Sequence, residues 1–299
     1  MTRRFTSLRL RLVLGFLLVS VPPMLAAAYV AARLISNAFE TNVEQWLGET
    51  AGYFKLEVAE AAGEAEKVAG VVAARLEGAG GQTLDIPATI EKELALLDSV
   101  GYDLYAVYSP KRAILYASRP FEAQTDLPLE ARQGVFQVTS GGKSFIMSGA
   151  ARPIRFGGDD AFLLVGTWID DIYLGGMKAV TSLDLRLYAR DGADFAPVIK
   201  TLEEGVPARP VPASVIDELS RSDEPVVGMD GDADSYKSVF SGLRGVNGKL
   251  VAFVFIGLRS SEGFYEQIGG PRLFLGIFLL GSLRSVLVGV AMSHILVQP

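Results

Sequence analysis

The sequence lacks cysteine altogether and contains a single histidine, His294. A chain without cysteine forms no disulfide, no thiolate metal site and no cysteine nucleophile. A single histidine excludes most histidine-dependent catalysis. The sequence also offers no Ser-His pair, no metal-ligand cluster and no G-x-S-x-G elbow. We therefore expect no enzyme activity within this chain, and neither a cofactor nor a metal ion.

Positive charge is scarce in the middle of the chain. Residues 34–271 carry 21 basic and 34 acidic side chains, a net charge of −13, whereas the ends are basic. An acidic surface repels phosphate backbones, and no run of basic residues offsets it. We expect no nucleic-acid partner.

Apolar residues make up 49% of the chain, too many for a purely soluble protein. Residues 12–34 open with an uncharged run to residue 32, long enough to cross a hydrocarbon core of roughly 30 Å. Pro22 and Pro23 should kink this first transmembrane helix. The alternative is a signal peptide cleaved near Ala26–Ala28, but the apolar run continues past these alanines.

A second apolar segment, residues 272–297, has the length of another transmembrane helix. Arg284 lies at its middle, where a charge is costly unless it snorkels, pairs or faces another helix. It is either a tolerated arginine beside two serines or a conformationally sensitive position at a helix interface. The sequence leaves both open.

The charges predict the orientation of the chain in a membrane. Residues 1–11 contain four arginines and no acidic residue, which favours a cytoplasmic N-terminal tail. Residues 35–271 are then extracytoplasmic, and the second helix returns the chain to the cytoplasm at residues 298–299. We therefore expect a two-pass protein of a bacterial inner membrane, with the lipid bilayer as a partner.

The region outside the membrane begins with a helical pattern. From residue 35 to about 76, apolar residues recur mostly every three or four positions, Trp46 among them. Such a helix is about 60 Å long, and the glycines that follow Leu76 should end it. The Ala- and Gly-rich segment Ala59–Ala74 would let a second helix approach closely, or pack against its own sheet.

Two groups of strands should follow the helix. After a short helix near 87–97, the period changes to that of strands at 102–108, 113–118, 134–139, 143–153 and 161–169. A helix near 170–181 leads to further strands at 183–189, 197–202, 225–229, 235–242 and 249–258, with a helix near 213–220. The sequence thus predicts an α+β protein with two antiparallel sheet modules, at 35–169 with the long helix and at 170–271.

This order resembles the double-Cache sensor regions of bacterial transmembrane receptors. Ile169–Gly192 resembles the helix, strand and Asp-Gly turn that open a membrane-proximal Cache module, and His294–Pro299 resembles the start of a HAMP linker. Trp46, within Val43–Leu47, is similar to the start of some sensor histidine kinase input domains. The resemblance implies two tandem PAS-like modules, a homodimer and a small-molecule ligand.

Alternation along two strands suggests where the ligand binds. It places Trp168 and Asp170 on one face near the end of their strand, and Arg152 on one face of the preceding strand. If these faces adjoin, the arginine and the aspartate could bind an organic acid or an amino acid. Tyr116 and Arg119 could complete this site. The alternative is a core tryptophan with a charged surface pair.

Asp230, Asp232 and Asp234 alternate in a way that could offer oxygen ligands to calcium. The glycine and the glutamate of a full calcium loop are missing at the required spacing, so we expect a solvated turn.

The sequence therefore predicts extracytoplasmic sensing of a small molecule and signal transduction across the membrane. The resemblance favours the input half of a two-component sensor histidine kinase. The alternatives are the input half of a chemoreceptor or cyclic-dinucleotide enzyme, or a membrane-anchored interaction protein without a small-molecule ligand.

Overall fold

The structure is a computed structural model. It describes residues 2–79, 88, 91, 92, 94, 97, 101–122, 127–156, 158–192, 194–200, 211–229, 236–259, 281, 284, 287 and 288. Its contacts divide the chain into two units. One comprises residues 44–231 and 236–259, and the other comprises 1–43, 232–235 and 260–299.

The smaller unit is described mainly by the first part of helix α1, Thr2–Ala79, which continues through Pro22 and Pro23. Among the helical residues that the structure describes, none form a stretch both long enough and apolar enough to cross a membrane. Of the second apolar segment, only Gly281, Arg284, Leu287 and Val288 are described. The rest of that segment and the HAMP-like ending lie outside the described residues.

The part of α1 that belongs to the larger unit has one buried face. Its buried apolar residues recur at three or four positions, as an amphipathic helix requires: Leu47, Ala51, Phe54, Val58, Ala62, Ala65, Ala69, Val72 and Leu76. This confirms the helix predicted from residue 35 to about 76. Trp46 is 39% exposed and lies outside the buried face, contrary to the sequence pattern.

The first sheet follows α1 and holds five antiparallel strands in the order β2-β1-β5-β4-β3. The strands are β1 Leu104–Tyr108, β2 Ile114–Ala117, β3 Arg132–Ser140, β4 Lys143–Phe156 and β5 Asp159–Trp168. β5 is central, as its uninterrupted apolar run predicts. One face packs on α1 and the other on a second apolar cluster that includes Tyr108, Phe162 and Trp168.

Helix α3, Asp171–Thr181, joins the first sheet to the second. The second sheet has the order β7-β6-β10-β9-β8. Its strands are β6 Asp184–Asp191, β7 Asp194–Lys200, β8 Val226–Met229, β9 Tyr236–Arg244 and β10 Leu250–Arg259, and helix α4, Ala213–Arg221, precedes β8. The aspartate trio at 230–234 and the proline-rich loop before α4 lie largely outside the described residues.

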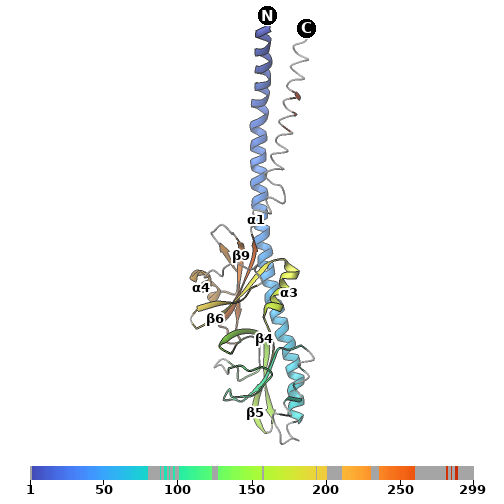
Figure 1. Cartoon of the computed structure of the whole chain (residues 1–299), viewed down its shortest axis with the longest axis vertical. Coiled ribbons are helices and arrows are strands. Elements are labelled where there is room, and N and C mark those ends of the chain that lie inside the picture. The colour runs from blue at the N-terminus through green and yellow to red at the C-terminus, as the bar shows by residue number, and fades with distance from the viewer. Residues whose placement is uncertain are drawn as a thin grey trace. The chain divides into compact units, whose positions relative to one another are not determined.

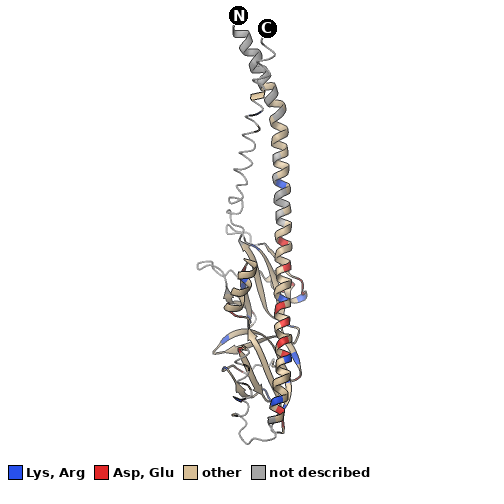
Figure 2. Ribbon diagram, turned by 90° about the vertical axis from the view of Figure 1, so that its right-hand side faces the viewer, with Lys and Arg blue, Asp and Glu red and all other residues tan. Residues whose placement is uncertain are grey.

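The two sheets share one topology. If the strands of each sheet are numbered one to five in chain order, both sheets have the spatial order 2-1-5-4-3. The second sheet therefore has the topology of the first without a repeated sequence. Figure 1 shows both sheets beside α1, and Figure 2 shows that acidic residues of α1, in red, lie along the part of the helix beside the sheets. The predicted α+β class with two antiparallel sheets is confirmed.

Candidate functional site

A groove of about 450 Å³ lies between the first and second sheets, within the larger unit. Its walls come from the β3–β4 turn with the start of β4, from the end of β5 with the start of α3, and from the β6–β7 hairpin. The residues that line it include Lys143, Phe145, Trp168, Asp170 and Asp191. Because both modules supply walls, a molecule bound here would contact both.

Trp168 belongs to the core more than to the groove. Its side chain is 9% exposed and packs in the apolar cluster on the face of the first sheet that faces away from α1. Its ring lies 5.4 Å from that of Phe145, centroid to centroid. The backbone N–H of Trp168 donates to Asp103 Oδ2 at 2.9 Å, which fixes the end of β5. Trp168 thus offers the groove a rigid edge.

Asp170 caps helix α3. Its Oδ1 accepts a hydrogen bond from the backbone N–H of Tyr173 at 2.9 Å, and its extended backbone is that of an N-cap residue. Asp170 lines the groove together with Asp171 and Asp191, against the single basic residue Lys143. The groove is therefore acidic, a charge that suits an ammonium group better than a carboxylate.

The β3–β4 turn carries Lys143 to the rim of the groove. Gly141 and Gly142 have φ values of 56° and 74°, in the left-handed region that glycine adopts without strain. Beside this turn, Gln137 Nε2 donates to Arg190 O at 2.6 Å and to Ser144 Oγ at 3.2 Å. The first of these bonds ties β3 of the first sheet to β6 of the second.

The structure does not bring Arg152 to Trp168 and Asp170, so the premise that their faces adjoin is wrong. In the β4–β5 register Arg152 pairs with Leu163, whose side chain lies in the cluster packed on α1. Arg152 is exposed beside α1, where a Cβ on Gly70 would lie 3.1 Å from Arg152 Nη1. Trp168 packs on the other face of the sheet.

Tyr116 and Arg119 also lie away from the groove lining. Tyr116, on β2, packs against the α1-facing cluster and stacks with Tyr105 at 6.4 Å between ring centroids. Arg119 is exposed after the end of β2. Of the five predicted residues, Trp168 and Asp170 alone line the groove.

Sequence reasoning missed Lys143, Phe145 and Asp191, which line the groove beside these two residues. Two signals pointed to them. Ser140–Gly142 and Asp191–Gly192 each lie between two predicted strands and consist of turn-forming residue types, and hairpin turns carry polar side chains to the end of a sheet. What the sequence did not show was that these two turns meet.

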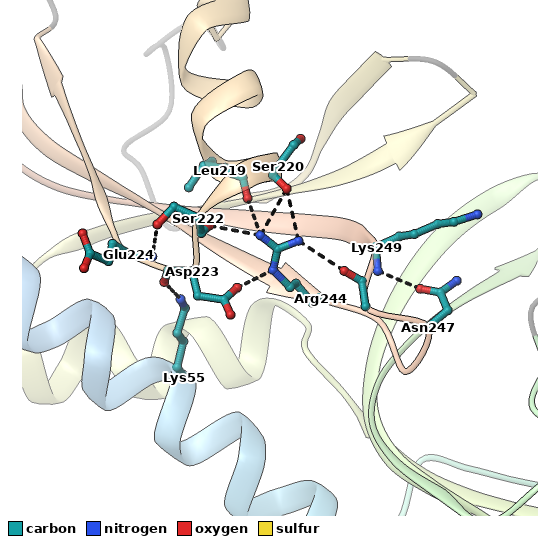
Figure 3. A network of polar contacts seen from close by, with 10 residues as sticks. Lys55, Leu219, Ser220, Ser222, Asp223, Glu224, Arg244, Asn247 and Lys249 are labelled. Atoms are coloured by element: carbon teal, nitrogen blue, oxygen red, sulfur yellow. Dashed lines mark hydrogen bonds and ion pairs between the residues drawn. The ribbon is translucent and has the colours of Figure 1, made fainter.

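A second set of polar contacts joins α1 to the second module (Figure 3). The Arg244 guanidinium, on β9, donates to the carbonyls of Leu219, Ser220 and Ser222 at the end of α4 and to Gly248 O in the β9–β10 turn. It also pairs with the carboxylate of Asp223, and Lys55 of α1 donates to the backbone carbonyl of Asp223. Arg244 therefore connects β9 with the end of α4 and with the β9–β10 turn, and Lys55 connects α1 to the same network through Asp223.

The electrostatics of this network follow from its geometry. The hydrogen bond from Arg244 lowers the pKa of the Asp223 carboxyl below its ordinary value. Burial lowers the pKa of the Lys55 ammonium, because desolvation disfavours the charged form. The positive charge of Arg244 at the C-terminal end of α4 also interacts favourably with the dipole of that helix.

The β9–β10 turn reaches the first sheet as well. Gly245 bridges to Val135 of β3, and the backbone N–H of Val246 donates to Val135 O at 3.3 Å. The side chain of Val246 packs against the apolar cluster that contains Trp168. A displacement of β3 would therefore reach the second sheet through this turn. Among the described residues, no group of three or more acidic or histidine side chains is arranged to hold a metal ion.

No protein-family model matches the chain, and no curated protein does. Solved structures similar to it include the periplasmic domain of Vibrio cholerae LuxQ, with 16% identity, 74% of this chain and 99% of that chain covered, and a TM-score of 0.42. The extracellular domain of a putative histidine kinase, rpHK1S-Z16, has 12% identity, 75% and 97% coverage, and a TM-score of 0.48. The ligand-binding domain of the Pseudomonas aeruginosa amino acid chemoreceptor PctC, solved with GABA, has 16% identity, 73% and 100% coverage, and a TM-score of 0.39. These are likenesses of fold, and they assign neither a ligand nor an output to this chain.

Proposed function

We propose that this chain is the input half of a two-pass receptor in a bacterial inner membrane. In this proposal it reads a small molecule outside the cytoplasm, the bound molecule shifts α1 or the second module, and the second transmembrane helix passes the shift inward. The observation that carries the proposal is that a single helix holds both sheet modules. Ser148 of β4 donates to Val58 O of α1 at 2.6 Å, and Lys55 of α1 donates to Asp223 O beside α4. A change in either module therefore reaches the same helix.

The proposed ligand site is the groove between the sheets. A ligand that fits one spacing of its walls better than another would shift the population between two packings of the modules. The three carboxylates around the groove favour a small amine or an amino acid held by its ammonium group. This keeps the amino acid expected from the sequence and disfavours a simple organic acid at this position.

Membrane anchoring is supported by the first part of α1. Seven of its described apolar side chains are more than half exposed, as they would be in a helix that faces lipid: Leu14, Leu18, Val19, Leu25, Tyr29, Val30 and Leu34. The exposed face of α1 in the larger unit is partly small and apolar. A Cβ on Gly52 or Gly63 would meet nothing, and Leu56 is 55% exposed. These features support a homodimer formed along α1.

The absence of cysteine provides a direct test of the topology. A single cysteine in place of Lys111, in the exposed β1–β2 turn, should react with a membrane-impermeant maleimide in intact spheroplasts. A cysteine in place of Thr2 should react only after lysis. Labelling of Thr2→Cys from outside, with Lys111→Cys protected, would contradict the proposed orientation.

For the output we propose a two-component histidine kinase, because Val43–Leu47 and the HAMP-like ending resemble such receptors. A chemoreceptor or a cyclic-dinucleotide enzyme remains the alternative. Joining the full chain to a HAMP linker and kinase body tests the proposal. Amine-dependent phosphorylation of the kinase is the expected result. A chain that binds amines but leaves kinase activity unchanged would instead favour one of the alternative outputs, and a chain that binds no small molecule would favour an interaction protein.

A further inference from the structure

Arg186 is a buried arginine on the second sheet. It lies on β6 with 6% of its surface exposed. Its Nη1 donates to the hydroxyl of Tyr188 at 3.0 Å, and its Nε is buried with no hydrogen-bond partner. No carboxylate of the described residues forms an ion pair with it.

Aromatic rings surround this guanidinium. Its central carbon lies 5.9 Å from the ring centroid of Tyr188 and also 5.9 Å from that of Phe255. Both rings belong to the apolar cluster on one face of the second sheet, together with Phe240 and Phe253, and α4 contributes Val215 and Leu219 to the same cluster. The rings attract a cation but accept few hydrogen bonds, so the guanidinium keeps unused donors.

Arg244 shows by contrast how this fold holds a structural arginine. Each of its three nitrogens donates to a carbonyl or carboxylate oxygen, and Asp223 supplies the opposite charge. Arg186 lies on β6, which β10 separates from β9, and it has neither kind of partner in the part of the chain that the structure describes. A buried positive charge that has no counter-ion destabilises a protein strongly, and a bound anion would remove that cost.

We propose that Arg186 anchors a second ligand site, for a small organic carboxylate, on the aromatic face of the second sheet. Nε and the remaining guanidinium donors match a carboxylate in a two-point fork. Tyr188, which accepts a bond from Arg186, can direct its own hydroxyl hydrogen to the ligand. The rings of Phe255 and its neighbours would contact the apolar part. The site goes beyond the proposed groove, since it lies in one module alone and takes an anion.

The test uses the full chain in lipid nanodiscs, with acetate, propanoate, benzoate and inorganic phosphate as probes and the matching amides as neutral controls. Thermal unfolding and titration calorimetry are measured for each. At least one carboxylate should raise the melting temperature with the concentration dependence of binding to the native state, whereas its amide should not. No response to any carboxylate, or a response to phosphate alone, would overturn the proposal.

Variants separate a ligand anchor from a structural arginine. Arg186→Met should weaken carboxylate binding at least tenfold while leaving the ligand-free melting temperature at or above that of the wild type. Arg152→Met is the control, because Arg152 lies on the first sheet and is exposed beside α1. It should bind as the wild type does. If Arg186→Met does not fold, Arg186→Lys keeps the charge without the fork and should still lose affinity.

Wild-type affinity in either Arg186 variant would overturn the assignment. The result is independent of the groove. Asp170→Asn should leave carboxylate binding unchanged, so a failure at Arg186 and a failure of the proposed amine site give different patterns.

Discussion

The hydroxyl of Ser148, on β4, donates a hydrogen bond to the backbone carbonyl of Val58, on α1, at 2.6 Å. Ser148 is 2% exposed and Val58 is 4% exposed, so the bond is shielded from water. It is a polar contact between the helix and the middle of the first sheet, whose helix-facing side is otherwise covered mainly by apolar side chains. Such a bond fixes the position of α1 along its own axis relative to the first sheet.

Replacing Ser148 with alanine should therefore loosen α1 from the first sheet. We expect a loss of about 0.5–1.5 kcal/mol in the free energy of unfolding, the usual contribution of one buried hydrogen bond. Hydrogen exchange should rise in α1 around Val58 before it rises elsewhere. Ser220→Ala is the control, since Ser220 Oγ bonds within its own helix, to Ile216 O, and is exposed. Equal effects of the two substitutions would show that the Ser148 bond has no special role.

Two glycines let β4 and β5 approach each other. Gly149 pairs with Gly166, and a Cβ on Gly149 would lie 2.3 Å from the carbonyl oxygen of Val165. We expect Gly149→Ala to lower the free energy of unfolding by about 1–3 kcal/mol, because the backbone atoms it meets cannot move aside. Chemical denaturation measures this.

Gly175 provides the matched control for that substitution. It lies in helix α3, where a Cβ would meet nothing within 4 Å. Gly175→Ala should raise stability by about 0.5–1 kcal/mol, since alanine is the better helix residue. A stability loss of similar size at both glycines would contradict the close-contact explanation.

Much of the fold could be predicted from the sequence because its signals are local. The apolar period of α1, the Asp170 cap and the hairpin turns each depend on residues within a few positions. The identical strand order of the two sheets was not visible as repeated residues, since each sheet keeps only the pattern of alternation. Burial of a sheet face constrains that pattern and leaves the residue types free.

The predicted site failed on a long-range feature, the register of β4 against β5. Alternation correctly separated the two faces of each strand, but it cannot say which face of one strand matches which face of the next. A slip of one residue reverses the answer. The observed register pairs Met147 with Trp168 and Arg152 with Leu163, which places Arg152 and Trp168 on opposite faces of the sheet. Trp168 and Asp170 stayed together because a single strand end positions both.

The ion pair of Asp223 with Arg244 makes stability depend on pH in acid. The hydrogen bond from Arg244 holds the pKa of Asp223 below its ordinary value of 3.8. A lowered pKa in the folded state means that the charged carboxylate stabilises the fold above pH 3.8, and that this stabilisation is lost as the pH falls through the folded pKa.

Asp223→Asn removes that dependence. We expect its melting temperature to lie below that of the wild type between about pH 5 and pH 7, by a few degrees at most, because the carboxylate is mostly exposed. The difference should shrink as the pH falls below 3.8. Asp217→Asn, an exposed change on α4, is the control and should show no such difference. A gap that persists unchanged into acid would mean that the asparagine disturbs packing instead of charge.

Asp170 has two roles in this proposal, and two substitutions separate them. Asparagine caps a helix as well as aspartate does, whereas alanine does not. Asp170→Asn should therefore keep nearly wild-type stability, and Asp170→Ala should lose about 1 kcal/mol as the bond to the Tyr173 N–H disappears. Both remove the negative charge from the groove. If the groove binds an ammonium group, both variants should lose the stabilisation that amines give the full chain.

Melting curves with methylamine, 1,4-diaminobutane and L-alaninamide measure this loss, with the N-acetylated forms as neutral controls. The informative variant is Asp170→Asn, because its fold and its cap remain while its charge is gone. Amine stabilisation that survives in Asp170→Asn at full strength would remove Asp170 from the site. Stabilisation lost in Asp170→Ala alone would show that the groove needs the start of α3 in place and not the charge itself. Loss in both would assign the recognition of the ammonium group to the carboxylate.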